Sequence, residues 1–523
     1  MAPLRRGPSA AAVLLGTAML AAGGCGSGGG LARVLPGPAG RLNPIYDVTV
    51  VFPDTEIVIN GLPHLGLEID LALEFGVETL ADEDPLFLAE ARVVEVRAGG
   101  AAQPFEVGGP LDIEGTLQDD LLATGPFGPI RVGTAGLVLD LTGALLDGRR
   151  RVAGETVLQG SGERGSFLAV KRRRYLVAAT DFMEFGRASL VSVRYDTRFS
   201  IEEGPDVVSS DPVARMEDGR PLVVNRLGSD NVQGLDPFSF ATVFEYSVGN
   251  GANPHDAVIL RPAAAGAPDA GADHPGFAFV TRYGPDFSDV AVLDLESGDV
   301  AGGIDLRPYA MNPDGTPRPD QILEHDGLLF VTLLDVDRSF TRYGTGRMVV
   351  IDPVARAVID VFDLPGQNPF ETLFFSGATG GIVLNLAGIF PGLLPQALTG
   401  GVVTIDPESR TAALLVDDDR LGGNVAGVAV HSAERGWCVV SDAAYRNAVK
   451  GFDPASGEVL ETIHDSPNLI SALETDGDGY LIVAENDFFE PRLLIFDAAT
   501  GGRVATLPLR LAPLSLAILT RSL

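Results

Sequence analysis

The stretch Asn447-Ala-Val-Lys-Gly-Phe-Asp-Pro-Ala-Ser-Gly-Glu-Val-Leu-Glu-Thr-Ile463 occurs again, with the same pattern, as Arg492-Leu-Leu-Ile-Phe-Asp-Ala-Ala-Thr-Gly-Gly-Arg-Val-Ala-Thr-Leu507. Each copy predicts an apolar strand that ends in Asp, a short turn and a second strand. The first half of the pattern is found again upstream at 290–294, 348–352 and 402–406. A unit repeated at this scale indicates a repeat architecture, and it fixes a fold rather than a chemistry.

The repeats predict four strands each, and they run from about residue 174 to the C-terminus. In the third repeat the strands, which we call a to d, are expected at 254–260, 276–282, 289–294 and 300–306. Dividing residues 165–523 among seven repeats gives about 51 residues each, which suits the blades of a β-propeller. We therefore predict a seven-bladed β-propeller over residues 163–523.

The first repeat lacks a strand a, and the missing strand is expected at the far end of the chain. Ala512-Pro513 introduces an apolar run at 514–519 with no further strand after it. Pairing this run with the first repeat closes the ring and removes both open sheet edges, which would otherwise promote aggregation. The predicted fold class is thus all-β, with a propeller closed by its C-terminal strand.

The repeats also resemble a known family of propellers. Phe279-Val280-Thr281-Arg282, Val223-Val224-Asn225-Arg226 and the Asp-containing turns between strands c and d resemble the YVTN-type seven-bladed β-propellers. The resemblance covers about two thirds of the chain, and it implies a fold more than a function. The sequence departs from the family tetrapeptide at Arg282, which stands where the family has Asn.

Before the propeller, residues 46–162 predict a separate domain made of strands and turns. Apolar and polar residues alternate with period two, as at 48–52 and 137–141, between clusters of Gly, Pro and Asp. This pattern favours a small antiparallel β-sandwich or barrel. No chemical motif is evident in it.

The N-terminus predicts an export signal over residues 1–24. Arg5 and Arg6 precede a short apolar run, which is too short for a membrane span and is typical of a signal peptide. Gly23-Gly24-Cys25 resembles a bacterial lipobox, although Ala22 stands where Leu is usual. The resemblance implies lipidation of Cys25, and the alternative is an ordinary signal peptide with an incidental cysteine.

The segment 25–45 is rich in Gly and Pro and predicts a flexible tether. Gly26 stands where the lipoprotein family carries an Asp that retains proteins in the inner membrane. The resemblance therefore implies an outer-membrane or cell-surface location. Cys438 is the other cysteine, inside an apolar strand, so we expect no disulfide and a buried thiol.

The net charge of −32 excludes partners that need a basic surface. Nucleic-acid phosphates are bound by Lys and Arg, so nucleic acid is not an expected partner. Broad contact with anionic lipid headgroups is disfavoured for the same reason. A lipid anchor would provide the membrane attachment instead.

Strand direction separates the polar residues onto two rims. We call the rim formed by the b–c and d–a connections the site rim, and the rim formed by the a–b and c–d turns the turn rim. On the site rim, the starts of strands a carry His255, Asp256, Asp320, Gln321 and Glu371, and the ends of strands b carry Arg226 and Arg282. On the turn rim, Asp196, Asp236, Asp294, Asp352, Asp406, Asp453 and Asp497 have the spacing of turn-forming residues.

The site-rim residues allow three interpretations. His255, Asp320 and Glu371 could hold a divalent cation, since imidazole and carboxylate groups are suitable ligands. The same groups could act in acid–base catalysis. Alternatively, Arg226 and Arg282 pair with the carboxylates in a water-filled funnel. Apart from that cation, no cofactor is expected, because no phosphate loop, nucleophile elbow or haem motif is present.

Two further segments have local explanations. Asp476-Gly-Asp-Gly resembles the start of a calcium loop but lacks its remaining ligands, and we interpret it as a turn. The connection 388–400 carries five large apolar residues on the site rim. It could be a lid, a docking patch, a membrane contact or a loop folded over its neighbouring blade.

Two functions follow from these features. The first is a lipid-anchored extracytoplasmic scaffold whose propeller binds a protein or glycan partner, since propeller loops vary without disturbing the core. The second is a hydrolase, similar in outline to the propeller lactonases, or a metal-assisted enzyme with its site at the mouth of the channel. A tight polar cluster with a bound ion would favour the enzyme, and a wide rim without one would favour the scaffold.

Overall fold

The computed structural model describes residues 45–519, apart from short internal gaps. The gaps are 60–61, 76–85, 108–110, 119–120, 125, 133–134, 147–150, 160, 195–198, 218–219, 237–238, 268–273 and 477–478. The predicted signal peptide, Cys25 and nearly all of the tether lie outside the described residues. The described residues form two compact units, one holding Leu176–Leu190 and Glu202–Ile518, the other 45–175, Val191–Ile201 and Leu519.

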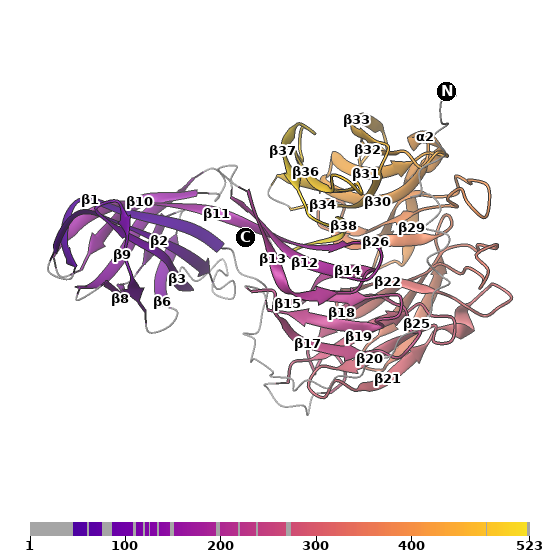
Figure 1. Cartoon of the computed structure of the whole chain (residues 1–523). Coiled ribbons are helices and arrows are strands. Elements are labelled where there is room, and N and C mark those ends of the chain that lie inside the picture. Colours follow the sequence, from indigo (N-terminus) through magenta and orange to yellow (C-terminus); the bar gives the residue numbers. More distant parts are fainter. Residues whose placement is uncertain are drawn as a thin grey trace, which may run out of the picture. The chain divides into compact units, whose positions relative to one another are not determined.

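Six four-stranded antiparallel sheets follow one another along the first unit, and each is one predicted repeat (Figure 1). Blade two is β14 (Pro212–Glu217), β15 (Arg220–Asn225), β16 (Asn231–Leu235) and β17 (Thr242–Ser247), and blade three is β18 (Pro254–Leu260), β19 (Phe277–Arg282), β20 (Asp289–Asp294) and β21 (Val300–Asp305). Blade four is β22 (Pro319–His325), β23 (Leu328–Leu333), β24 (Arg347–Asp352) and β25 (Ala357–Asp363), and blade five is β26 (Pro369–Ser376), β27 (Gly381–Leu386), β28 (Gly401–Asp406) and β29 (Thr411–Asp417). Blade six is β30 (Asn424–Ser432), β31 (Arg435–Ser441), β32 (Asn447–Phe452) and β33 (Val459–Ser466), and blade seven is β34 (Leu469–Thr475), β35 (Tyr480–Asn486), β36 (Arg492–Asp497) and β37 (Arg503–Pro508). In the part of the chain that the structure describes, two short helices lie in connections, η2 (Arg307–Tyr309) and α2 (Asp418–Leu421).

Blade one closes the ring in the predicted way. Its strand a is the C-terminal strand β38 (Ala512–Ile518), which pairs with β11 (Glu163–Thr180), followed by β12 (Gly186–Arg194) and β13 (Phe199–Val208). The Leu519 N–H donates to the Arg174 carbonyl and continues the pairing. The prediction of a seven-bladed propeller closed by its last strand is confirmed.

The middle strands of the blades are apolar because both of their faces are buried. In β19, the five residues from Phe277 to Thr281 are buried, whereas the outer strand β37 alternates between exposed and half-buried residues. One core cluster joins Phe279 and Val292 of blade three to Val331 and Val349 of blade four. Neighbouring blades thus share their cores, and each blade stabilises the next.

The second unit is one curled antiparallel sheet rather than two packed sheets. Its pairs run in a cycle through β1 (Ile45–Ile59), β2 (Leu62–Phe75), β3 (Leu86–Ala98), β6 (Leu111–Gln118), β7 (Leu121–Thr124), β9 (Ala135–Leu146), β10 (Arg151–Leu158) and the first part of β11, which returns to β1. Short strands β4 (Ala101–Ala102), β5 (Phe105–Glu106) and β8 (Phe127–Val132) add to it. Alternate residues such as Val50, Ile69 and Leu139 fill its interior. Of the two forms predicted from the sequence, the barrel-like one is found.

β11 contributes to both sheets. Its residues up to Arg172 pair with β1 and β10, and the division between the compact units falls between Tyr175 and Leu176. The domain boundary predicted at residues 162 and 163 stays a prediction. In blade six, Cys438 is buried as predicted, and burial raises the pKa of its thiol to about 12.

Candidate functional site

Three strands a begin side by side at the site rim with the same local irregularity. β18, β22 and β26 each open with a proline, and in each the pairing register with strand b shifts directly afterwards. The shifts fall between Pro254 and Ala257, between Pro319 and Ile322, and between Pro369 and Leu373. Such bulges turn residues out of the ladder and re-aim their side chains. The predicted site residues of these strands lie inside the three bulges.

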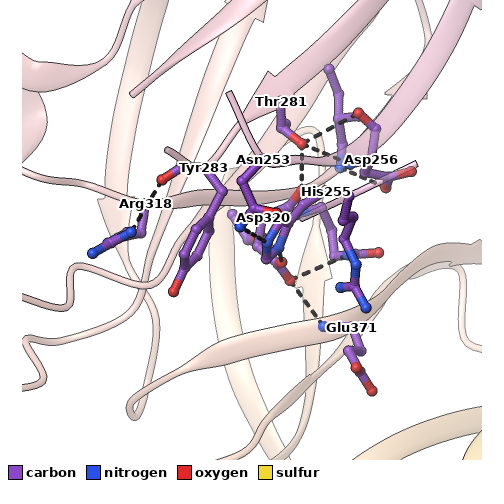
Figure 2. Close-up of polar contacts among 12 residues, drawn as sticks. Asn253, His255, Asp256, Thr281, Tyr283, Arg318, Asp320 and Glu371 are labelled. Carbon is purple, nitrogen blue, oxygen red and sulfur yellow. Dashed lines mark hydrogen bonds and ion pairs between the residues drawn. The ribbon is translucent and has the colours of Figure 1, made fainter. Parts of the chain in front are cut away.

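The centre of the site is a buried pair of His255 and Asp320 (Figure 2). His255 Nδ1 lies 2.5 Å from Asp320 Oδ1, and Asn253 Nδ2 lies 3.2 Å from His255 Nε2. The arrangement assigns the ring proton to Nδ1, so that Nε2 accepts from Asn253. Burial lowers the pKa of His255 and outweighs the opposite effect of Asp320, which keeps the ring neutral near pH 7.

The imidazole is also fixed by an aromatic ring. Tyr283 stacks on His255 with ring centroids 4.0 Å apart and planes only 3° from parallel. The phenol is enclosed, and burial raises the pKa of Tyr283 above its ordinary value, so the hydroxyl keeps its proton. Behind Tyr283, the Arg318 guanidinium lies over its ring at 4.7 Å. The pair is thus held by stacking as well as by hydrogen bonds.

Asp320 links three neighbouring blades through its two carboxylate oxygens. Oδ1 contacts His255 of blade three, whereas Oδ2 accepts the backbone N–H of Glu371 of blade five at 2.9 Å. Oδ2 also accepts the Gln321 side-chain N–H at 3.2 Å. The carboxylate is 1% exposed, so these bonds replace its water contacts. Asp320 is the residue that assembles the site.

Glu371 projects into a water-accessible part of the site. Its backbone has a φ of 69°, a left-handed conformation that is uncommon for a residue with a side chain. In Figure 2 its N–H faces Asp320 while its carboxyl group points away from the pair. Enclosure by the surrounding protein raises the pKa of Glu371, Asp320 and Asp211 add to the rise, and Arg226 opposes it. Because the side chain is exposed to water, the rise is smaller than full burial would give.

Asp256 and Gln321 are held by an arginine that the sequence analysis did not single out. Arg215, in β14, donates through Nε to Asp256 and through Nη2 to Gln321 at 2.7 Å. The other oxygen of Asp256 accepts the Ile322 N–H at 3.0 Å. The sequence feature that could have revealed Arg215 is its position inside a strand a, because a side chain there faces residues of other blades. Asp256 and Gln321 therefore belong to a structural network next to the His255–Asp320 pair.

Arg226 and Arg282, the two arginines predicted on the site rim, form ion pairs with carboxylates that do not belong to the strands a. Arg226 donates to Asp211 at 2.6 Å, yet it lies close enough to Glu371 and Asp320 to interact with both electrostatically. Arg282 donates through Nε to Asp289 at 2.7 Å and lies over the Phe287 ring. The interpretation that both neutralise the strand a carboxylates by direct pairing is therefore wrong. Arg226 borders the site, and Arg282 also donates to the Val248 carbonyl, in the connection from blade two, at 2.9 Å.

The predicted cation ligands do not converge in this arrangement. Within the described ranges, no group of three or more His, Cys, Asp or Glu residues is placed to hold a metal ion. Both ring nitrogens of His255 are already engaged, one by Asp320 and the other by Asn253. Metal binding by His255, Asp320 and Glu371 would require the His255–Asp320 bond to open and Glu371 to turn.

The turn-rim aspartates fulfil the predicted structural role. Each accepts one or more backbone N–H groups of its own turn: Asp236, Asp294, Asp352, Asp406, Asp453 and Asp497. Asp196 lies outside the described residues. Asp476 likewise accepts the N–H groups of Gly479 and Tyr480, as expected of a turn.

The connection 388–400 lies against blade six. Asn424 of β30 donates to the carbonyls of Ala387 and Ala397, and Gln396 donates back to Asn424. Among the alternatives for this segment, folding over the neighbouring blade agrees with these bonds. Leu393 nevertheless stays 74% exposed at its tip.

The site rim carries the most exposed large apolar side chains of the described residues. These are Phe489 at 95%, Met183 and Met311 at 75%, and Leu393 at 74% exposure. Met183, Leu393 and Phe489 lie in b–c connections of blades one, five and seven, and Met311 lies between blades three and four. Only Leu393 was noted in the sequence, because the others are isolated residues in short connections.

Comparison with known proteins identifies no family for this chain. No protein-family model matches it, and no curated protein does. Solved structures similar to it include hydrazine synthase of Kuenenia stuttgartiensis, with 14% identity and a TM-score of 0.40, and apo AztD of Citrobacter koseri, with 12% and 0.39. The matches cover 64% and 66% of this chain, and 94% and 98% of the other chains. At these scores they say nothing about its ligand.

The described part of the chain holds no helix with the length and apolar character needed to cross a bilayer.

Proposed function

We propose that this protein is a binding scaffold of the bacterial envelope, and that the site rim of its propeller docks a protein partner. The observation that carries the proposal is that the four most exposed large apolar side chains of the described residues all lie on this one rim. Exposed apolar surface costs solubility, and on a rigid scaffold it is typical of a docking surface. These residues come from different blades, so a partner must span the rim to cover them.

The polar mouth adds specificity to this surface. His255, Asp320 and Arg226 are held in place by buried or partly buried bonds, and Glu371 is presented to water from a strained backbone. Polar groups fixed in this way discriminate between partners, because a mismatched partner would leave them unpaired. Apolar rim residues then supply affinity, and the mouth supplies selectivity.

The envelope location rests on the N-terminal sequence. The lipobox-like Gly23-Gly24-Cys25, the basic residues before it and the Gly/Pro-rich segment after it support an anchored outer-membrane or cell-surface protein. The YVTN-type motifs support assignment to that propeller class. A glycan partner would be compatible with the same location, but the methionine and leucine side chains of the rim favour protein.

The proposal is tested by comparing partners bound to two double variants of the full-length protein. Met311→Ser with Leu393→Ser changes the site rim, and Val354→Ser with Val504→Ser changes exposed residues of the turn-rim side. Proteins that co-purify from the envelope are quantified by mass spectrometry. We expect the recovered amount of one partner to fall by about tenfold or more with the first variant and to stay unchanged with the second. Equal recovery with both variants would contradict the proposal.

A second candidate function is that of a hydrolase, because His255 and Asp320 have the arrangement of an orienting carboxylate and a base. For the ring to act as a base, its Nε2 would have to exchange Asn253 for a substrate or water. The test is a screen of ester and lactone hydrolysis with the wild type and Asp320→Asn. Turnover that is lost in the variant would support the enzyme.

A further inference from the structure

Two connections of the site rim share a short sequence. Asp181-Phe182-Met183-Glu184 joins β11 to β12 in blade one, and Asp487-Phe488-Phe489-Glu490 joins β35 to β36 in blade seven. Both follow a buried strand b and occupy the same place in their blades. Because the ring closes between blades seven and one, the two turns belong to neighbouring blades.

The aspartate of each turn fixes its backbone. Asp181 Oδ1 accepts the N–H groups of Met183 and Glu184 at 2.8 and 2.9 Å, and also that of Phe185. Asp487 Oδ1 accepts the N–H groups of Phe489 and Glu490 at 2.8 and 3.2 Å. Burial opposes ionisation of Asp181, yet the backbone hydrogen bonds lower its pKa below the usual value. The apolar side chains are therefore presented by ordered turns.

The apolar residues of the two turns form one surface, which we call the seam patch: Phe182, Met183, Phe488 and Phe489. The Phe182 and Phe488 rings are in contact, with centroids 5.4 Å apart. Met183, Phe488 and Phe489 are 75%, 53% and 95% exposed. Aromatic and methionine side chains adapt to an apolar partner at little entropic cost.

Acidic side chains border the seam patch on both turns. Glu184 and Glu490 are exposed beside Met183 and Phe489, and they add to the charge of −32 on the chain. Arg492 Nη1 lies 3.9 Å from Glu490, whereas its Nε is engaged by the buried Glu485. The patch thus combines apolar side chains with negative charge.

We propose that the seam patch binds a basic amphipathic segment of a protein partner. Apolar residues of the segment cover the seam patch, and its Lys and Arg residues lie beside Glu184 and Glu490. This inference rests on the proposed function and names the part of the site rim, and the partner chemistry, that it uses. Complementary charge increases the association rate and sets specificity, and burial of the apolar face provides affinity.

The charge argues against two other occupants. A second copy of this chain would bring its own acidic residues against Glu184 and Glu490, which is unfavourable. An anionic lipid surface would be repelled for the same reason. A basic protein segment satisfies both the apolar and the charged parts of the surface.

The test uses a fluorescein-labelled amphipathic helical peptide of Leu and Lys, and a control peptide in which every Lys is Glu. Fluorescence anisotropy measures binding to the full-length protein. We expect the Lys peptide to bind and the Glu peptide not to bind. The double substitution Met183→Ser with Phe489→Ser should lower the affinity for the Lys peptide by about tenfold or more. The control, Val354→Ser with Val504→Ser, removes exposed apolar side chains of the turn-rim side and should change the affinity for the Lys peptide by less than about twofold.

A second pair of substitutions tests the charge without touching the apolar side chains. The double substitution Glu184→Lys with Glu490→Lys should lower the affinity for the Lys peptide, and it should allow the Glu peptide to bind. Equal binding of the Lys peptide by both double serine variants would overturn the proposal, because attraction by the whole acidic surface would then explain it. Flotation of the wild type with phosphatidylserine vesicles, lost in the seam-patch variant, would also overturn it in favour of lipid.

The outcomes separate this inference from the proposed function. If partner recovery depends on Met311 and Leu393 while the peptide affinity is the same with and without the seam patch, the inference fails and the proposed function stands. If neither partner recovery nor peptide binding depends on any site-rim residue, both fail.

Discussion

Asp320 shows how one carboxylate joins parts of the chain that are far apart in sequence. It uses one oxygen for His255 and the other for the Glu371 N–H, in an environment with almost no water. An asparagine at this position has a single acceptor oxygen. Its amide N–H group would therefore face either the His255 N–H or the Glu371 N–H, which would lose its acceptor. Removing one acceptor from such a buried network leaves a donor unsatisfied.

We expect Asp320→Asn to lower the free energy of unfolding by about 2 kcal/mol. Urea unfolding followed by tryptophan fluorescence measures the change. The matched control is Asp406→Asn, because a single oxygen of Asp406 accepts both N–H groups of its turn and an asparagine can replace it. Its effect should stay within about 0.5 kcal/mol. Equal effects of the two substitutions would contradict the role given to Asp320.

Glu371 should make the stability of the protein depend on pH. Its pKa is raised above the ordinary 4.5, so the folded state keeps the proton at pH values where the unfolded state has lost it. Folding is therefore disfavoured progressively as the pH rises above 4.5. Gln cannot ionise, so Glu371→Gln should be more stable than the wild type at neutral pH, with the smallest difference below pH 4.5. Melting temperatures from pH 4 to 8 measure this.

Glu461 provides a control of opposite sign. Burial opposes its ionisation, but hydrogen bonding and Arg435 lower its pKa below the ordinary value. Glu461→Gln should therefore be slightly less stable than the wild type above pH 4.5, and the difference should vanish as the pH falls. A parallel pH dependence for both variants would contradict the assignment to Glu371.

At the residue scale, the sequence predicted what depends on local spacing. The turn aspartates are recognisable because their partners are two to four residues away, as for Asp294 and Asp497. His255, Asp320 and Glu371 were correctly grouped, since strand direction placed them on one rim. Arg215 and Asp211 were missed because their partners lie outside their own repeat or depend on how the blades meet.

At the element scale, β38 determines whether the ring is closed. It supplies the inner strand of blade one, and Leu516 and Leu519 are 3% and 1% exposed. Ser471 of blade seven and the Ala214 N–H of blade two bond to it on either side. Its loss would leave blade one without a strand a and remove the burial of these two leucine side chains.

Deleting residues 512–523 should therefore destabilise the propeller by about 3 kcal/mol or more, from the two leucines alone. Differential scanning calorimetry measures the transition. Deleting only residues 520–523 leaves β38 intact and is the control. An unchanged melting transition in the longer deletion would contradict the closure.

The bulges at the start of β18, β22 and β26 show what strand prediction could not provide. The prolines at 254, 319 and 369 indicated where each strand begins. Period-two alternation, however, assumes a regular ladder, and the register shifts after these prolines change the direction of the following side chains. The site's residues were predicted, and its hydrogen bonds were not.

At the scale of the whole molecule, the N-terminal sequence predicts how the protein is attached. Replacing Cys25 with Ser should abolish membrane association, because the lipid is the expected anchor. Fractionation of cells into membrane and soluble parts measures this, and a Cys438→Ser variant is the control. Unchanged membrane fractionation of Cys25→Ser would contradict lipidation.

The repeats made the fold of the larger unit predictable, because the strand assignment of each repeat is supported by the same pattern in the others. The barrel-like unit has no such repetition, and its alternating strands were compatible with two sheet arrangements until the pairs of β10 with β9 and β11 resolved them. The apolar site rim escaped prediction because Met183, Met311 and Phe489 are distant in sequence and come to lie on one rim only in the folded ring.

The measurement that tests the central claim most directly is site-specific photocrosslinking in the producing cells. A photoreactive amino acid replaces Phe489 or Met311 on the site rim, and Val354 or Val504 on the turn-rim side. The account predicts a discrete adduct with a protein partner from the first two positions and none from the other two. No adduct from the site rim, or equal yields from both sides, would contradict a propeller that docks its partner through this rim.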